Sequence, residues 1–334
     1  MAVLSLGGTI AMTSTNTDGP GVRPRLDAAA LLEAVPAVAA IAGIRARSVR
    51  SVPGASLRFD DLLDCLGCAR AEVEAGAAGV VVTQGTDTLE ESAYLLDLLW
   101  DRPEPLVVTG AMRHPELPSP DGPGNLLASV VVASSVQARE RGVLAVLNDE
   151  IHAARHVRKT HSSALSAFVS PDTGPVGRVR EGSAVLLGSL PRPPALPAPV
   201  PQQWPSVALV EAVLDESGGL LRLIDEAYDA VVVSAFGTGH VSETMAGQIE
   251  KLASQIPVVF ASRTGAGGTY RRTYGFPGSE QDLLARGAVP AGFLDPRKAR
   301  ILLAVLLAGG ADQLAIRTAF SRHGHPDGGP GSWR

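Results

Sequence analysis

Short apolar runs alternate with amphipathic segments along the first two-thirds of the chain, and this order predicts an α/β fold. Runs that are apolar throughout are typical of parallel strands buried on both faces. We expect strands at residues 3–6, 44–49, 79–83, 105–110 and 142–147. Between them lie helical patterns such as residues 88–100, where Leu89, Ala93, Leu96 and Trp100 share one face. The order predicts a doubly wound domain with a mostly parallel sheet.

A proline-dense stretch, LPRPPALPAPVPQQWP, interrupts this pattern and is expected to be extended. The α/β pattern then resumes, with strands expected at 207–213, 229–236 and 257–263 and a helix from 295 to Gly309-Gly310. We therefore predict a larger N-terminal catalytic α/β domain (1–189), a proline-rich linker (190–206) and a smaller C-terminal α/β domain (207–334).

Composition narrows the possible partners and the compartment. The chain has 334 residues, 45% of them hydrophobic, and a formal net charge of −5. No basic excess is available to neutralise phosphates, so we expect no nucleic-acid partner. No apolar run has the length of a membrane span, so we expect no membrane association. The N-terminus lacks a basic stretch followed by a long apolar run, and there are only two cysteines, which together predict a cytoplasmic protein.

The two cysteines form a C-x-x-C pattern, Cys65 and Cys68, which admits two interpretations. One is a redox pair, which needs its first thiol at a helix N-terminus. The other is a pair of small apolar residues inside a helix. Leu62, Leu66 and Ala69 recur at helical spacing around Cys65, and this favours the helix interior.

Candidate chemistry lies in the turns that leave the expected strands, because ligands of open parallel sheets bind beyond the strands' carboxyl ends. The first turn is Gly7-Gly8-Thr9. Its glycines allow a sharp turn, and its backbone N–H groups could hold an oxyanion. Taken alone, this motif favours Thr9 as a helix cap or turn residue.

The second turn, residues 83–91, follows a strand and opens a helix. Thr88 with Glu91, and Asp87 with Glu90, each fit a capping box. Neither box uses Thr86. A hydroxyl beside a carboxylate without a structural duty indicates a nucleophile system.

The third turn, residues 148–161, is basic and follows another strand. It could be a solvated charged edge. His152 and His156, four residues apart, could instead bind zinc, but no further acidic ligand has a helpful spacing. A third interpretation directs Lys159 to the sheet end, where a partly buried lysine can act as a base.

Together these motifs resemble those of the bacterial-type L-asparaginases and related amidohydrolases. The matching stretches are LGGTIA, TQGTDTLEESA, VVTGAMRHP with SPDGPGNL, residues 142–177, and GFLDPRKARILL. They occur in the family's order and span most of the chain.

The resemblance implies hydrolysis of the side-chain amide of L-asparagine to L-aspartate and ammonia, without a metal or organic cofactor. Thr9 matches the family's nucleophile, and Thr86, Asp87 and Lys159 match its supporting residues. Asp87 also matches the residue that holds the α-ammonium of the substrate. The resemblance also implies substrate-binding positions at Gly8, Gly85 and Ala111, and at Ser56 and His240 where the chain departs from the family pattern. A homo-oligomer, a dimer or a tetramer with sites at the subunit interface, is also implied.

The chain departs from the family pattern at three places. A tyrosine on the loop after the nucleophile is missing, and Gly21 falls near its position. Tyr270 and Tyr274 could replace it from a neighbouring subunit, or they pack in the core or at an interface. Ser56 is chosen over Gly54 and Ala55 as the residue for the substrate carboxylate, with capping of the next helix as its alternative role. His240 stands where the family has asparagine.

These departures leave other functions open. The same mechanism could act on L-glutamine, a D-amino-acid amide or a small peptide amide. A non-catalytic amino-acid-binding or regulatory protein on the same scaffold is a third possibility, although binding alone does not need a matched nucleophile and base. The glycines at 265–268 lack the G-x-G-x-x-G spacing of a dinucleotide site.

Overall fold

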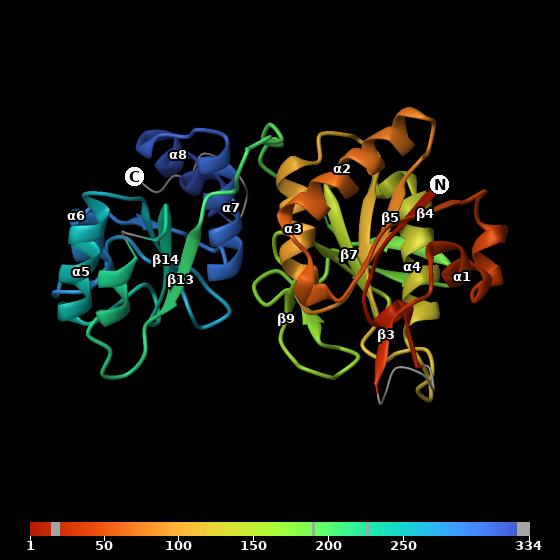
Figure 1. Ribbon diagram of the computed structural model, residues 1–334, viewed down its shortest axis with the longest axis horizontal. Helices are drawn as coiled ribbons and strands as arrows, with labels where there is room; N and C mark the ends of the chain where they lie inside the picture. Colours follow the sequence, from red (N-terminus) through yellow and green to blue (C-terminus); the bar gives the residue numbers. More distant parts are fainter. Residues whose placement is uncertain (15–20, 189–190, 225–226, 326–334) are drawn as a thin grey trace. The chain divides into compact units, whose positions relative to one another are not determined.

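The computed structural model describes residues 1–14, 21–188, 191–224 and 227–325. The chain divides into two compact units, Met1–Leu190 and Pro191–Arg334, and each combines a sheet with helices (Figure 1). The described residues 191–206 at the start of the second unit form neither a helix nor a strand.

The first unit contains four α-helices and several short 3-10 helices among its described residues. The helices are α1 (Ala28–Glu33), α2 (Phe59–Glu74), α3 (Leu89–Leu99) and α4 (Gly122–Ser134), with 3-10 turns η1 (Thr9–Ala11), η2 (Pro36–Ala40), η3 (Gly54–Ser56) and η4 (Val136–Ala138). The strands are β1 (Ala2–Gly7), β2 (Met12–Ser14), β3 (Val22–Pro24), β4 (Arg45–Val52), β5 (Val80–Thr83), β6 (Leu106–Thr109), β7 (Val143–Leu147), β8 (Glu150–Ala153), β9 (Arg158–Lys159), β10 (Phe168–Val169), β11 (Gly177–Arg180) and β12 (Ser183–Leu186).

The main sheet of this unit has eight strands in the order β12-β11-β8-β7-β6-β5-β1-β4. Strands β4, β1, β5, β6 and β7 run parallel, whereas β8, β11 and β12 join antiparallel beyond β7. The chain passes from β1 outward to β4 and then crosses back to β5 on the other side of β1. The strand order therefore reverses between β1 and β5, and such a switch point is where open α/β sheets bind ligands.

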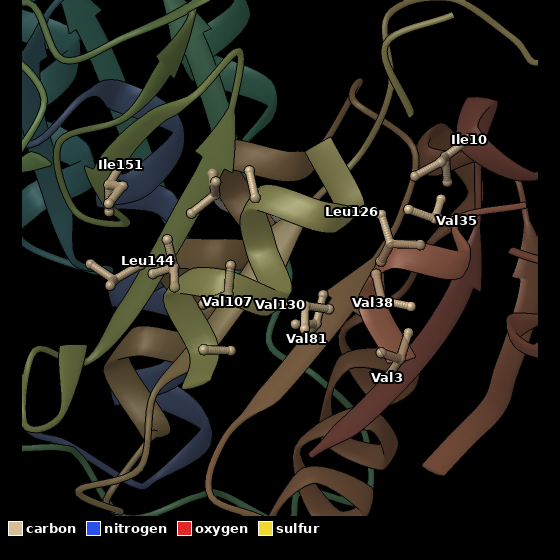
Figure 2. Packing of buried hydrophobic residues seen from close by; sticks show 14 of the residues in the cluster. Val3, Ile10, Val35, Val38, Val81, Val107, Leu126, Val130, Leu144 and Ile151 are labelled. Carbon is tan, nitrogen blue, oxygen red and sulfur yellow. The ribbon is translucent and has the colours of Figure 1, made fainter. Parts of the chain in front are cut away.

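The core of the first unit lies between the sheet and the layer formed by α1, η2 and α4 (Figure 2). Valines and a leucine on four adjacent strands pair across the sheet in one row, in the order Val3, Val81, Val107 and Leu144. Val130 of α4 packs in the same cluster. Burying each such side chain contributes about 1.5–3 kcal/mol, so this row fixes the register of the strands that lead to the switch point. Helices α2 and α3 cover the opposite face (Figure 1).

Two residues nearer the strands' carboxyl ends, the same face changes from apolar to hydroxyl side chains. Ser5, Thr83 and Thr109 lie in register on β1, β5 and β6. All three are buried. The Thr109 hydroxyl donates to the Val146 carbonyl at 2.7 Å, and the Ser5 hydroxyl accepts the Gly7 N–H at 3.3 Å. The core therefore ends where the polar turns begin.

The second unit is built on a parallel sheet in the order β13-β14-β15-β16. Its elements are β13 (Val207–Glu211), η5 (Gly219–Leu223), β14 (Ala230–Ala235), α5 (Glu243–Ala253), β15 (Val258–Ser262), α6 (Glu280–Ala285), β16 (Val289–Pro290), α7 (Pro296–Ala308) and α8 (Gln313–His323). Side-chain caps start its helices: Ser242 accepts the Met245 N–H, and Asp295 accepts the Arg297 N–H ahead of Pro296.

The predicted fold class is confirmed, with a larger, mainly parallel N-terminal sheet and a smaller C-terminal α/β sheet. Each strand expected from an apolar run is present. One detail was wrong: the run 44–49 was expected to be buried on both faces. It forms β4, which is the edge of the sheet, and the side chains of Arg45 and Arg47 are exposed.

Candidate active site

Three glycines bring the turns after β1, β4 and β5 into backbone contact at the switch point. A Cβ atom on Gly8 would lie 2.0 Å from the Gly85 nitrogen, and one on Gly85 would lie 2.7 Å from the Gly54 nitrogen. Gly8 also has a φ of +82°, a conformation that other residues rarely adopt. The glycines of these turns are therefore required by close packing, and this packing gathers Thr9, Ser56 and Thr86 at one end of the sheet.

Thr9 begins the 3-10 turn η1 immediately after β1 and is half-buried. Gly8 occupies the N-cap position of that turn, and no side chain caps it. The interpretation of Thr9 as a helix cap is therefore wrong, whereas its interpretation as a turn residue is confirmed. The strand and the glycine turn instead place a threonine hydroxyl at the carboxyl end of β1.

Thr86, Asp87 and Lys159 come together as predicted from the motifs. The Lys159 Nζ atom lies 2.9 Å from Thr86 Oγ1 and 3.3 Å from Asp87 Oδ1. Thr86 is 5% exposed, whereas the Asp87 side chain is 66% exposed. The methyl group of Thr86 faces Gly110, where an added Cβ would lie 3.2 Å from it. The hydroxyl is thus held toward the lysine, and a carboxylate oxygen remains at the surface.

Neither of the predicted capping boxes forms at the start of α3. Thr88 is the N-cap residue, but its side chain makes no cap hydrogen bond and instead donates to the Gly54 carbonyl at 2.9 Å. The Glu90 carboxylate accepts the backbone N–H of Lys159. The side chains of Thr88 and Glu90 therefore form hydrogen bonds with distant segments in place of the predicted capping bonds. These contacts connect the turns of the site to each other.

Ala111 follows β6 and is completely buried. Its turn is held by Asp121, whose carboxylate accepts the N–H groups of Met112 at 2.9 Å and Arg113 at 2.8 Å. Asn125 donates to the Gly110 carbonyl at 2.9 Å and accepts the Asn148 N–H at 2.9 Å. Sequence reasoning named no role for Asp121 or Asn125, although both lie in the motif SPDGPGNL.

Ser56 ends η3 and is exposed, two residues after the glycine that contacts Gly85. Its alternative role as the cap of the next helix is wrong, because Arg58 is the N-cap residue of α2. Ser56 therefore stays a candidate for binding the substrate.

His240 lies in the second unit, within a polar and aromatic cluster. Its Nε2 atom lies 3.2 Å from both Thr238 Oγ1 and Glu280 Oε2. The Glu280 side chain is completely buried. The rings of Tyr274 and Phe276 meet the His240 ring edge-on, with centroids 4.8 and 5.1 Å away. The carboxylate therefore fixes the orientation of the imidazole.

The Glu280 carboxyl is ionised in this setting. Burial by itself would raise its pKa, but N–H groups of Tyr274, Glu280 and Thr273 and the ring of His240 hydrogen-bond to it and hold the pKa below its ordinary value.

The two candidate tyrosines are exposed, Tyr270 by 46% and Tyr274 by 41%. Their interpretation as core residues is therefore wrong, and the roles at an interface or a neighbouring site stay predictions. The loop expected to carry the missing tyrosine lies partly outside the described residues, at 15–20.

The zinc interpretation of His152 and His156 required a helical spacing that the structure does not have. His152 is a buried residue of strand β8, with Nδ1 3.0 Å from Ser170 Oγ and Nε2 3.4 Å from Glu150 Oε2. Over residues 1–14, 21–188, 191–224 and 227–325, no cluster of three or more His, Cys, Asp or Glu side chains could hold a metal ion.

The prediction that the cysteines lie inside a helix is confirmed. Both belong to α2, and Cys65 is completely buried. Burial raises the pKa of its thiol to about 12, which keeps it protonated and unreactive. No helix in the described part of the chain is both long and apolar enough to cross a membrane.

Comparison with known proteins agrees with the family that the motifs resemble. Residues 1–191 match the model of the asparaginase N-terminal domain, and residues 206–320 match that of the glutaminase/asparaginase C-terminal domain. A probable L-asparaginase of Deinococcus radiodurans is 35% identical over 96% of this chain and 97% of that protein. A probable periplasmic L-asparaginase of Haemophilus influenzae is 31% identical over 96% and 92%.

The fold comparison leads to the same family. The crystal structure of a probable cytoplasmic L-asparaginase from Campylobacter jejuni superposes with a TM-score of 0.84. It is 30% identical and the match covers 96% of this chain and 98% of that one. With both domain models matched in order and the motif residues gathered at the switch point, the chain belongs to the asparaginase family.

Proposed function

We propose that the protein is an L-asparaginase that hydrolyses the side-chain amide of L-asparagine to L-aspartate and ammonia, with Thr9 as the nucleophile. The observation that carries the proposal is the Lys159–Thr86 contact of 2.9 Å at the switch point, beside the turn that presents Thr9. An activated hydroxyl, a base and backbone donors are what acyl transfer requires.

In the first half of the reaction the Thr9 oxygen bonds to the amide carbon as the hydroxyl proton leaves. The negative charge then rests on the former carbonyl oxygen, which N–H groups of the glycine turns stabilise. The C–N bond breaks as the carbonyl re-forms, and the nitrogen takes up the proton that the Thr9 hydroxyl gave up and leaves as ammonia. The product of this half is an ester between Thr9 and the aspartyl side chain.

In the second half a water molecule attacks the ester carbon. Lys159 takes a proton through the Thr86 hydroxyl, which lies within hydrogen-bonding distance of its Nζ atom. The bond to the Thr9 oxygen breaks, the threonine regains its proton, and L-aspartate is released. The pair therefore serves as the proton acceptor of this half.

Binding of the amino acid uses groups around these residues. The exposed Asp87 carboxylate binds the α-ammonium group, and Ser56 binds the α-carboxylate. The backbone at Gly8, Gly85 and Ala111 lines the remainder of the site. L-glutamine is one methylene longer, and its turnover relative to L-asparagine measures how closely the site fits the shorter chain.

The proposal includes a homo-oligomer, a dimer as its minimal unit, in which His240 of a neighbouring copy contributes to the site. Tyr270 and Tyr274 are the candidates to replace the missing tyrosine. Their exposure and the fixed orientation of His240 support this part. Light scattering of the purified protein tests it, and a monomer that turns over at full rate would contradict it.

The proposed location is the cytoplasm. Free, buried Cys65 is compatible with a reducing compartment. The two relatives differ in their described location, which is cytoplasmic for the Campylobacter jejuni protein and periplasmic for the Haemophilus influenzae protein. Fractionation of cells that express the protein, followed by immunoblotting, decides between the two.

The first experiment is ammonia release from L-asparagine, with Thr9→Ala assayed beside the wild type. We expect release by the wild type and none above background by the variant. Release by Thr9→Ala at the wild-type rate would refute the nucleophile. A folded wild type that binds L-asparagine without releasing ammonia would favour the non-catalytic alternative, and release from another amide would reassign the substrate.

A further inference from the structure

We propose that Glu90 is a positioning residue that holds Lys159 against Thr86; this inference rests on the proposed function. Glu90 lies in the first turn of α3 and is 3% exposed. Its carboxylate accepts the backbone N–H of Lys159, 69 positions away. This hydrogen bond could not be predicted from the residues that neighbour Glu90 or Lys159 in the sequence.

Lys159 needs such an anchor because its own strand is short. Strand β9 consists of Arg158 and Lys159 and, among the described residues, pairs with β10 alone, in a two-stranded sheet apart from the eight-stranded one. The Lys159 N–H is directed to Glu90 on α3, while its Nζ atom reaches Thr86 and Asp87. Both ends of the lysine are therefore held by residues 86–90.

The segment 86–90 is itself fixed to the main sheet. Thr86 lies three residues after the end of β5, and Thr88 donates to the Gly54 carbonyl beyond β4. A buried carboxylate is costly unless it is hydrogen-bonded, and the N-terminus of α3 favours a negative charge in its first turn. Glu90 thus links the backbone of Lys159 to a segment whose position is fixed by the main sheet.

The test compares Glu90→Ala and Glu90→Gln in ammonia release from L-asparagine, with kcat and KM measured separately. We expect Glu90→Ala to lower kcat about 10- to 100-fold, since misplacing a catalytic group by about 1 Å costs rate of this order. KM should fall together with kcat, so that kcat/KM changes less than about threefold, because the lysine serves hydrolysis of the acyl-enzyme and not its formation. Glu90→Gln should retain most of the rate, because its amide oxygen can accept the same N–H.

Asp97→Ala is the matched control. Asp97 lies on the same helix, is 9% exposed, and its carboxylate accepts the backbone N–H of Val143 at 2.9 Å. The substitution Asp97→Ala therefore removes a buried hydrogen bond between a carboxylate and a backbone N–H, of the same kind but away from Lys159. We expect a loss of thermal stability similar to that of Glu90→Ala, with kcat of the folded protein near the wild-type value.

Crystal structures of the variants keep the inference separate from the proposed function. In Glu90→Ala the distance from Lys159 Nζ to Thr86 Oγ1 should exceed about 3.5 Å, the limit of a hydrogen bond, whether or not L-asparagine is the substrate. An unchanged distance, wild-type kcat in Glu90→Ala, or an equal kcat loss in Asp97→Ala would overturn the inference. If Glu90→Ala does not fold, Glu90→Asp, whose carboxylate is one methylene shorter, must show the same loss of kcat.

Discussion

The Nζ atom of Lys159 lies 2.9 Å from the Oγ1 atom of Thr86, although 73 positions separate the two residues in the chain. One belongs to the short strand β9, outside the eight-stranded sheet, and the other follows the strand β5 of that sheet. The contact exists only in the folded protein. In this contact the Lys159 amine donates to the Thr86 oxygen, and the proposed reaction passes a proton along it in the opposite direction. This relationship leads to the first two predictions.

Thr86→Val should abolish most turnover and leave the fold intact. Valine keeps the branched shape and the methyl group that faces Gly110, and removes only the hydroxyl. We expect ammonia release to fall by about 10²–10⁴-fold, the usual contribution of proton transfer by a positioned group. Thr160→Val is the control, because that hydroxyl donates only to the Ala167 carbonyl at 3.2 Å. Wild-type turnover in Thr86→Val would refute the role of Thr86.

Lys159→Met should impair turnover to a similar degree, since methionine keeps the unbranched stem and lacks the amine. If Thr86 and Lys159 act as one unit, the double variant should be no slower than the slower single variant, because residues that act together are strongly non-additive. Ammonia-release rates of the four proteins form the cycle. Multiplicative losses would mean that the two residues act independently.

Gly8→Ala should destabilise the first unit and inactivate it. The added Cβ would lie 2.0 Å from the Gly85 nitrogen, and the φ of +82° strains any other residue by about 1–3 kcal/mol. Gly67→Ala is the matched control: this exposed glycine of α2 has no atom within 4 Å of its added Cβ, so the change should stabilise by about 0.5–1 kcal/mol. Urea denaturation measures both. Equal stability of the two variants would show that the turns do not need their close contact.

The strands that lead to the site could be predicted because their apolar runs reflect burial on both faces. Val80–Val82 and Val231–Val233 are examples, and all of them are completely buried. The edge strand β4 differs, because among the described residues it pairs with β1 alone and the side chains of Arg45 and Arg47 are exposed. Sequence periodicity identified the strand but not its place in the sheet.

The residue types of the candidate site and the meeting of Thr86, Asp87 and Lys159 could be predicted from the motifs, whereas the partners of Thr88 and Glu90 could not. The motifs indicated hydroxyl, carboxylate and amine groups at strand ends, and Thr86, Asp87 and Lys159 do meet. Local rules failed for Thr88 and Glu90, because each bonds to a backbone group of a distant segment in place of its own helix. A capping box can be recognised in sequence, but a competing partner many positions away cannot.

The second unit should lose stability in acid through Glu280. Hydrogen bonds from two N–H groups at 2.7 and 2.8 Å and the contact with His240 hold the pKa of its carboxyl below the ordinary value of 4.5. A carboxyl whose pKa is depressed by folding stabilises the protein at pH values above 4.5, and this stabilisation is lost as pH falls through the lower, folded-state pKa.

Glu280→Gln should therefore be less stable than the wild type at pH 7, by about 1–2 kcal/mol for weakened bonds to a charged acceptor. The difference should begin to shrink below pH 4.5, where the unfolded wild-type carboxyl takes up a proton, and should be lost once the pH falls below the lower, folded-state pKa. Glu243→Gln, which neutralises an exposed carboxylate in the first turn of α5, is the control and should change little at either pH. Thermal unfolding at several pH values measures the difference, and a gap between Glu280→Gln and wild type that stays constant down to pH 3 would show that the buried carboxylate is not the acid-sensitive group.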